Sequence, residues 1–401
     1  MDYNICTVDE ANGRMIARAG LTDFGCTLLS IRCVLLFIFL WMSGLYPVKP
    51  VQAAPTPSDT PPIFDQTEGV YKDATLKEDV SWRGTILVSG YLVVAPQATL
   101  RIEPGTVVRF SAGGTSRQMP RLVIMGRIVA VGAPENPIRF LQARSAGGTW
   151  GGILLLASEK RNRLEHCFIE AAQTAIDARF SGFTAKNLTV TNSTTGVLLQ
   201  DSVVSMQGCA ISTCETGLEV HDSELDVRDS VISENRTGMA LLRSAVVISS
   251  VVLRANTQQG ILSDDCRLKI SSCEVVDNAA GARIRGGEGR LFMSRFTRNR
   301  DTALHITGAR LTINRCRIAD NLRDGMLLSD GRAVVWDNDF SGNAGYNLVS
   351  AGLENLLAVR NWWGTADESS LMAKIRIGSE NKSSGALGVF PWLTEKPVAL
   401  P

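Results

Sequence analysis

Four aspartates have the side chains and the spacing to act together in a reaction. Asp201 and Asp222 are 21 residues apart, and Asp264 and Asp265 are adjacent. Two carboxylates held about 5 Å apart suit a retaining glycosidase or a cation site. If the chain is an enzyme, these four are the first candidate catalytic residues.

The same aspartates have a second interpretation, a surface ladder of ion pairs. Arg243 occupies the equivalent place in the sequence pattern, between Asp222 and Asp265. A cation placed between stacked carboxylates neutralises them, which leaves no free acid for catalysis. The pattern favours this ladder over a catalytic site.

Other kinds of site find little support in the sequence. His166, His221 and His305 fall in different repeats and cannot share a metal ion, and no Cys-x-x-Cys pair is present. No Gly-rich nucleotide loop and no nucleophile elbow occur. With 41 basic and 40 acidic residues, the chain has no positive excess to attract nucleic acid. We therefore expect no metal, no cofactor, no nucleotide and no nucleic-acid partner.

An internal repeat sets the elements that must position any site. Asparagines recur in steps of 21 or 22 residues, with Cys214 in place of one, at Asn192, Asn235, Asn256, Asn278, Asn299, Asn321 and Asn343. A glycine follows each a few residues later, with Ala303 as the exception, at Gly196, Gly217, Gly238, Gly260, Gly281 and Gly325. Apolar residues alternate after each glycine, which indicates short strands with one face inward.

Short strands at a constant period, without hairpin turns, predict an all-β fold. We expect a single-stranded right-handed parallel β-helix, a solenoid of about 21–22-residue coils, in which equivalent strands stack about 4.8 Å apart. A buried Asn at each bend would bond the bend backbone and the Asn above and below it. Each Gly would take a bend conformation closed to residues with side chains.

The two ends of the chain predict export and capping. An apolar stretch begins at Val34, and Val51-Gln52-Ala53 places small residues where a signal peptidase cuts. We expect a signal peptide over 1–53, and so an exported protein, periplasmic or extracellular; left uncleaved, the signal would hold the chain at a membrane. A Pro-rich linker and N-terminal cap over 54–80, the β-helix over 81–365 and a C-terminal capping tail over 366–401 complete the expected organisation.

The cysteines that follow the signal are expected to be reduced. Cys167, Cys209, Cys273 and Cys316 share one inward column of the repeat. The nearest pairs are two coils apart, about 9–10 Å, whereas a disulfide needs Cα atoms within about 7 Å. These thiols are therefore predicted to be small core residues.

Segments at both ends of the repeat resemble a known group of proteins. Residues 92–110 and 122–140, and the closing Asn361-Trp362-Trp363-Gly364, are similar to bacterial right-handed β-helix repeat proteins of the pectin-lyase-like superfold. The resemblance implies the fold, which hosts many chemistries. Relatives that cleave polygalacturonate carry a Gly-His-Gly beside acidic pairs, and no His here is flanked by glycine.

Taken together, these patterns favour an exported non-catalytic β-helix scaffold that binds glycan or protein in the cell envelope or outside the cell. Its partner would be a polysaccharide or a cell-envelope protein, held on an outer apolar strip that includes Leu198, Ala240 and Leu262. The alternative is a polysaccharide lyase or glycoside hydrolase acting on an acidic polysaccharide, with Asp201, Asp222, Asp264 and Asp265 as catalytic candidates.

Overall fold

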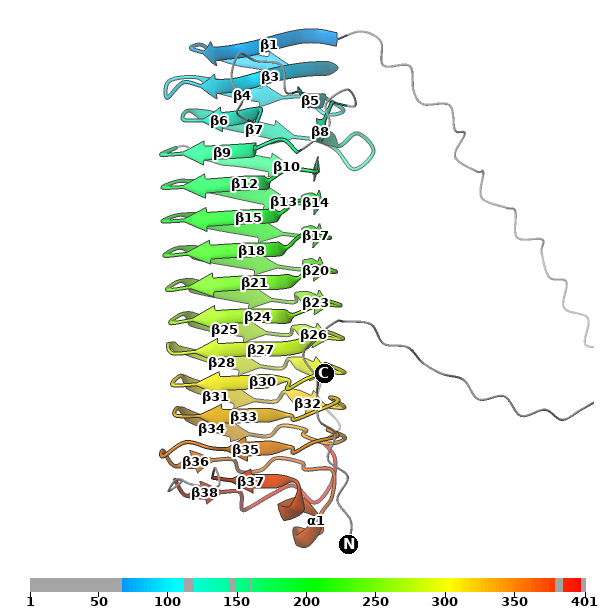
Figure 1. Ribbon diagram of the computed structural model, residues 1–401, viewed down its shortest axis with the longest axis vertical. Coiled ribbons are helices and arrows are strands. Elements are labelled where there is room, and N and C mark those ends of the chain that lie inside the picture. The colour runs from blue at the N-terminus through cyan, green and yellow to red at the C-terminus, as the bar shows by residue number, and fades with distance from the viewer. Residues whose placement is uncertain (1–66, 112–118, 144–148, 159–160, 379–384, 398–401) are drawn as a thin grey trace, which may run out of the picture. The chain divides into compact units, whose positions relative to one another are not determined.

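The computed structural model describes residues 67–111, 119–143, 149–158, 161–378 and 385–397. Within this part the chain winds into stacked coils, each strand lying parallel to its equivalent one coil further on (Figure 1). The predicted right-handed parallel β-helix is confirmed. The predicted signal peptide and most of the Pro-rich linker lie outside the described residues.

One wall of the solenoid is a 14-stranded parallel sheet. Its strands are β2 (Val80–Trp82), β4 (Thr99–Ile102), β7 (Arg127–Val131), β10 (Asn162–Glu165), β13 (Gly182–Lys186), β16 (Val203–Gln207), β19 (Glu224–Arg228), β22 (Ala245–Ser249), β25 (Arg267–Ser271), β28 (Glu288–Phe292), β31 (Arg310–Asn314), β34 (Arg332–Trp336), β36 (Leu356–Leu357) and β38 (Leu387–Gly388).

The rest of the wall is a 24-stranded sheet, in which most coils place one short and one longer strand. The strands of the first coils are β1 (Thr67–Leu76), β3 (Thr85–Val94), β5 (Val107–Ser111), β6 (Arg121–Ile124), β8 (Ile138–Gln142) and β9 (Gly152–Leu156). The later short strands are β11 (Cys167–Glu170), β14 (Thr189–Thr191), β17 (Ala210–Ser212), β20 (Val231–Ser233), β23 (Val252–Arg254), β26 (Glu274–Val276), β29 (Arg295–Thr297) and β32 (Arg317–Ala319). The later long strands are β12 (Thr174–Arg179), β15 (Thr195–Gln200), β18 (Thr216–His221), β21 (Thr237–Leu242), β24 (Gln259–Asp264), β27 (Ala280–Arg285), β30 (Leu304–Thr307), β33 (Met326–Ser329), β35 (Leu348–Ser350) and β37 (Ile375–Ile377).

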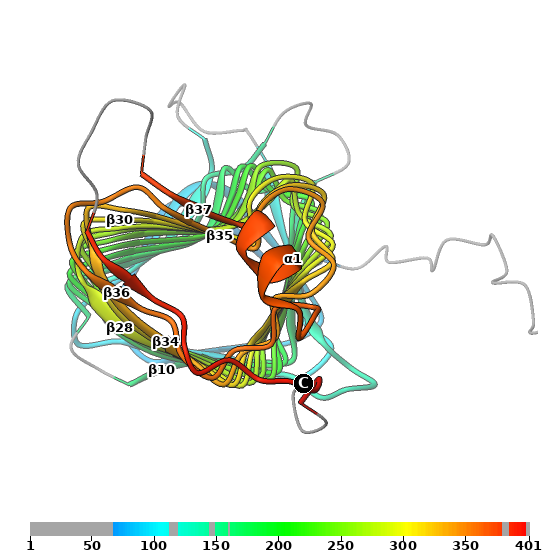
Figure 2. The same cartoon turned by 90° about the horizontal axis from the view of Figure 1, so that it is seen from below.

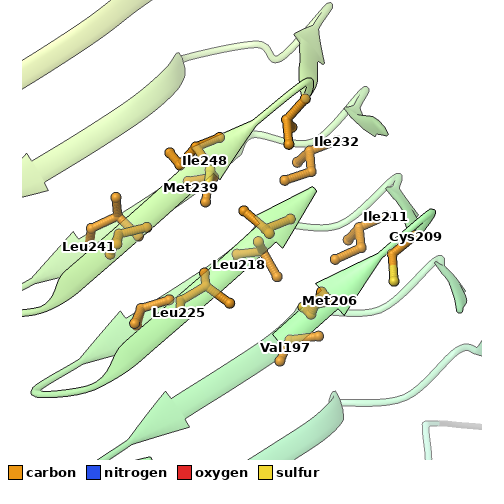
Figure 3. Packing of buried hydrophobic residues seen from close by; sticks show 14 of the residues in the cluster. Val197, Met206, Cys209, Ile211, Leu218, Leu225, Ile232, Met239, Leu241 and Ile248 are labelled. Carbon is orange, nitrogen blue, oxygen red and sulfur yellow. The ribbon is translucent and has the colours of Figure 1, made fainter. Parts of the chain in front are cut away.

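Strand alternation fills the interior with aliphatic columns. Val197, Leu218 and Met239 are register partners on successive coils and are fully buried, and Figure 3 shows them stacked. Each side chain therefore packs against its equivalent above and below. Such columns bury apolar area with small side chains, at about 25 cal/mol per Å² removed from water.

An asparagine ladder runs down the bend between the short and long strands. The side-chain Oδ1 of Asn278 accepts from the backbone N–H of Asn256 at 3.0 Å, and its Nδ2 donates to the carbonyl of Leu253 at 3.0 Å. The same bonds link Asn235, Asn256, Asn299, Asn321 and Asn343 to their neighbours. Each buried bend thus has its polar groups satisfied by the coil beside it.

Asn192 is an exception that corrects the expected column. It is exposed and has a φ of 52°, and its amide donates to Glu170 on the previous coil. The ladder position of this coil belongs to Ser193, whose hydroxyl accepts from the N–H of Ala172 at 3.2 Å. Because Asn also tolerates left-handed backbone, it suits the neighbouring bend position equally well.

The glycine column has a different cause from the one expected. Positive φ at the bends falls on other residues, and Gly238 is not among the positive-φ glycines. What excludes a side chain is the next coil, because a Cβ on Gly238 would lie 2.5 Å from the carbonyl oxygen of Gly260. The same close approach holds for Gly196, Gly217, Gly260, Gly281 and Gly325.

Two further ladders complete the coil bends, and one of them contains Cys209, Cys273 and Cys316. Cys214 stands in the asparagine ladder and Cys266 in the serine ladder. Ser181, Ser202 and Ser223 are buried, and each hydroxyl accepts from the N–H of the coil before. At the third bend, the N–H of Cys209 donates to Ser230, and that of Cys316 to Asn338. The six cysteines of the described region are buried and free.

Burial makes these thiols unreactive in the folded protein. It raises the pKa of Cys273 to about 11 and that of Cys316 to about 12. The reactive thiolate therefore appears only as the pH rises towards these values. We expect no iodoacetamide labelling of either cysteine at pH 8 by mass spectrometry, and full labelling in guanidinium. Rapid labelling of the folded protein would show that the coils open locally.

The C-terminal end of the stack is closed by an aromatic pair and a short helix. The ring of Trp363 stacks on Phe340 with centroids 4.9 Å apart. Helix α1 (Glu368–Ala373) follows, capped by Asp367, and buries Leu371 (Figure 2). No helix within the described ranges has the length and apolar character needed to cross a membrane.

Candidate functional site

A groove of about 1390 Å³ runs along the outer face of the 14-stranded sheet. It extends from β10 to β31, so its long direction crosses the strands and follows the solenoid axis. Its floor is made by outward side chains, which alternate with the inward core residues of each strand. Open, extended grooves of this kind suit a chain-like ligand better than a compact one.

One end of the groove carries a cluster of cations. Arg267 and Lys269 come from β25, Arg290 from β28 and Arg310 from β31, all exposed. Lys269 and Arg290 are direct register partners. In the described part of the structure Arg267, Lys269 and Arg310 form no ion pair, and Arg290 lies 5.1 Å above the ring of Phe292. We call these four residues the groove cations.

At several other places on the solenoid, a cation is neutralised by an acid one coil away. Arg243 contacts Asp222 at 2.6 Å and Arg298 contacts Asp277 at 2.8 Å. Glu288 lies between Arg267 and Arg310 in register, yet it makes no ion pair with either within 4.0 Å. Because like charges placed side by side destabilise a sheet, the pairing of Lys269 with Arg290 does not serve stability. The groove cations create a positive region that favours an anionic ligand.

The other end of the groove combines exposed apolar residues with Arg161 and Arg163. Phe180 lies at the turn before β13, and Val203 begins β16; each is 62% exposed. Gly182, the register partner of Val203, adds no side chain to the floor. The groove therefore has an exposed aromatic residue at one end and basic residues at both ends.

The structure separates the four predicted aspartates. Asp201 lines the groove, whereas Asp222, Asp264 and Asp265 do not. Hydrogen bonds from Arg243 hold the pKa of the Asp222 carboxyl below its usual range. Asp264 is paired with Arg285 at 3.0 Å. Two of the four are thus members of ion-pair ladders, and only Asp201 reaches the groove.

The remaining sequence candidates lie on other faces. The ring of His221 contacts Glu219 at 3.0 Å on the outer side of β18. Leu198, Ala240 and Leu262 are half-buried on the outer face of the long strands. In the ranges that the structure describes, no group of His, Cys, Asp and Glu residues is arranged to hold a metal ion.

Sequence reasoning missed the groove cations and Phe180. The sequence did contain a signal for the cations, because the basic residues Lys269 and Arg290 occupy the same outward position in consecutive repeats. For Phe180 the signal was an aromatic residue at a bend where other repeats have Asp, Arg or Ala. Neither pattern shows by itself which outer face is hollowed.

Comparison with known families and structures agrees with the fold. A model described as "Right handed beta helix region" matches residues 146–265, 174–311 and 259–362. A comparison with curated proteins gave no match.

Several solved structures are similar to the chain at low identity. The A-module of mannuronan C-5 epimerase AlgE4 from Azotobacter vinelandii has 13% identity and a TM-score of 0.45, covering 65% of this chain and 88% of its own. The periplasmic alginate epimerase AlgG has 12% identity and a TM-score of 0.42, covering 79% and 78%. The tailspike protein gp49 of Acinetobacter baumannii bacteriophage Fri1, a capsular polysaccharide depolymerase, has 10% identity and a TM-score of 0.38, covering 84% and 63%. These likenesses extend to the fold alone.

Proposed function

The chain belongs to the right-handed β-helix family, whose model matches it between residues 146 and 362, and from this premise we propose that it is an exported, non-catalytic scaffold that binds an acidic polysaccharide along its groove. The observation that carries the proposal is the set of groove cations without ion-pair partners. Export is inferred from the predicted signal peptide over 1–53.

Charge complementarity supports an acidic ligand. Arg267 and Lys269, then Arg290, then Arg310 follow one another on three successive coils, each rising about 4.8 Å. A polyuronate carries a carboxylate on every sugar, so a chain lying along the groove presents anions to successive coils. Arg guanidinium groups bind carboxylates through paired N–H donors. The groove's own residues, and not the likeness to alginate-active proteins, support this ligand.

A binding assay tests the proposal. The protein is titrated with a soluble polyuronate and, separately, with a neutral polysaccharide of similar length. We expect saturable binding of the acidic polymer that weakens as ionic strength rises, because salt screens exposed charges. Equal binding of both polymers, or binding of neither, contradicts an acidic-glycan scaffold.

A second candidate function, a lyase or hydrolase of acidic polysaccharide, is favoured by one observation. Asp201 lines the groove together with Glu224 and Asp226 of β19, so that carboxylates and cations share one surface. Such a mixture is what acid–base chemistry on a uronate chain requires. This enzymatic function is an alternative to the proposed non-catalytic scaffold.

A screen for turnover distinguishes an enzyme from a non-catalytic scaffold. We expect the wild-type protein to release neither reducing ends nor unsaturated products from acidic polysaccharides. If products do appear, Asp201→Asn should abolish their release, whereas Asp265→Asn, outside the groove lining, should leave it unchanged. Turnover that depends on Asp201 would replace the non-catalytic proposal with an enzymatic one.

A further inference from the structure

Phe180 is an aromatic residue in a place where the fold gives no reason for one. It lies at the bend between β12 and β13 with φ of 50° and its side chain is 62% exposed. The positive φ recurs at this bend in the other coils, so the unusual feature is the aromatic ring, and an exposed ring gains little from the core. The equivalent bend positions in the described coils are Ala157, Asp201, Asp222, Arg243, Asp265, Gly286, Gly308 and Asp330.

The backbone around Phe180 is fixed by neighbours that hold it in this conformation. Its N–H donates to the carbonyl of Gln200 at 3.0 Å. The next residue, Ser181, is part of the serine ladder: its N–H donates to Ser202, and its hydroxyl donates to the carbonyl of Arg179. The same bonds hold this bend in the neighbouring coils, so the backbone of Phe180 is fixed at the edge of the groove, whose lining it shares.

We propose that Phe180 is a stacking platform for one sugar ring at the end of the groove formed by β13 and β16. One face of a pyranose ring is made of C–H bonds and packs flat against an aromatic ring, which removes both surfaces from water. Gly182 leaves the neighbouring floor as bare backbone, and exposed Val203 adds a second apolar surface. This inference rests on the proposed function and adds an aromatic contact at the end of the groove opposite the groove cations.

The test compares an oligouronate with the same oligosaccharide after its carboxyl groups are reduced to alcohols. Calorimetric titrations use the full chain and the variants Phe180→Ala and Phe180→Trp. We expect Phe180→Ala to raise Kd about tenfold for both ligands, and by the same factor at low and high salt, because stacking involves no net charge. Phe180→Trp should bind as tightly as the wild type.

Two controls exclude a structural explanation. Alanine stands at the equivalent bend position 157, so Phe180→Ala should keep the unfolding temperature of the wild type or raise it. Leu322→Ala removes another apolar residue, 67% exposed at a bend that does not line the groove, and should leave both affinities unchanged.

The outcomes distinguish this inference from the proposed function. If Phe180→Ala binds the oligouronate like the wild type, the stacking role is wrong and the acidic-glycan scaffold stands. If the wild type binds both ligands equally and Phe180→Ala weakens both, the preference for acidic glycan is wrong and the stacking role stands. If the wild type binds neither ligand, both are overturned.

Discussion

Replacing Lys269, Arg290 and Arg310 together with glutamine should weaken the binding of a polyuronate by about a hundredfold at low ionic strength. Each guanidinium or ammonium group that bonds a carboxylate contributes enough for about a fivefold to tenfold change in Kd when it is lost. Lys269 and Arg290 are register partners, and Arg310 lies one coil further on, so the three act on neighbouring parts of one ligand. The measurement is Kd by calorimetry across a salt series.

The salt series distinguishes direct contacts from a general loss of charge. The Debye length falls from about 10 Å at 0.1 M to about 3 Å at 1 M salt. Wild-type affinity should therefore fall steeply over this range, and that of the triple variant only slightly. A triple variant with the steep dependence of the wild type would show that the groove cations do not contact the ligand.

A matched control variant loses three positive charges, as the triple variant of the groove does. Arg243, Arg285 and Arg298 are each paired with an aspartate and do not line the groove. Their joint replacement with glutamine should leave Kd nearly unchanged and cost little stability, because exposed ion pairs contribute little to stability. Equal losses in the two triple variants would indicate attraction by net charge and contradict a built site.

Much of this fold could be predicted from the sequence because its determinants repeat. Asn256 and Asn278 lie one coil apart, and the side chain of Asn278 accepts hydrogen bonds from Asn256 across that spacing. A period of 21 or 22 residues is therefore visible in the sequence before any pairing is known. Gly238 and Gly260 repeat for the same reason, although the cause is the approach of successive coils and not the backbone angle first expected.

The candidate site was far less predictable from the sequence, because it is recognised only by comparing the residues on different outer faces of the solenoid. Lys269 and Arg290 look like ordinary outward residues until they are compared with cations such as Arg243 that are neutralised one coil away. Asp201 and Asp222 look alike in sequence, yet one lines the groove and the other binds Arg243.

The asparagines offer the second large effect, on stability. Asn278→Ala should lower the free energy of unfolding by about 4 kcal/mol, since a buried donor or acceptor left without a partner costs about 1–3 kcal/mol. The substitution removes the acceptor of both the N–H and the Nδ2 of Asn256 and the donor to the carbonyl of Leu253. The measurement is denaturant unfolding followed by circular dichroism.

Asn192→Ala is the matched control, because the same substitution is made in the same sequence motif. Asn192 is exposed and outside the ladder, so its loss should change the free energy of unfolding by no more than about 1 kcal/mol, the cost of placing Ala instead of Asn at a φ of 52°. Each coil contacts only its neighbours, so a local defect at Asn278 can also split the transition into two steps. Equal small effects at both positions would mean that the ladder does not stabilise the solenoid, and that the aliphatic columns alone hold the coils together.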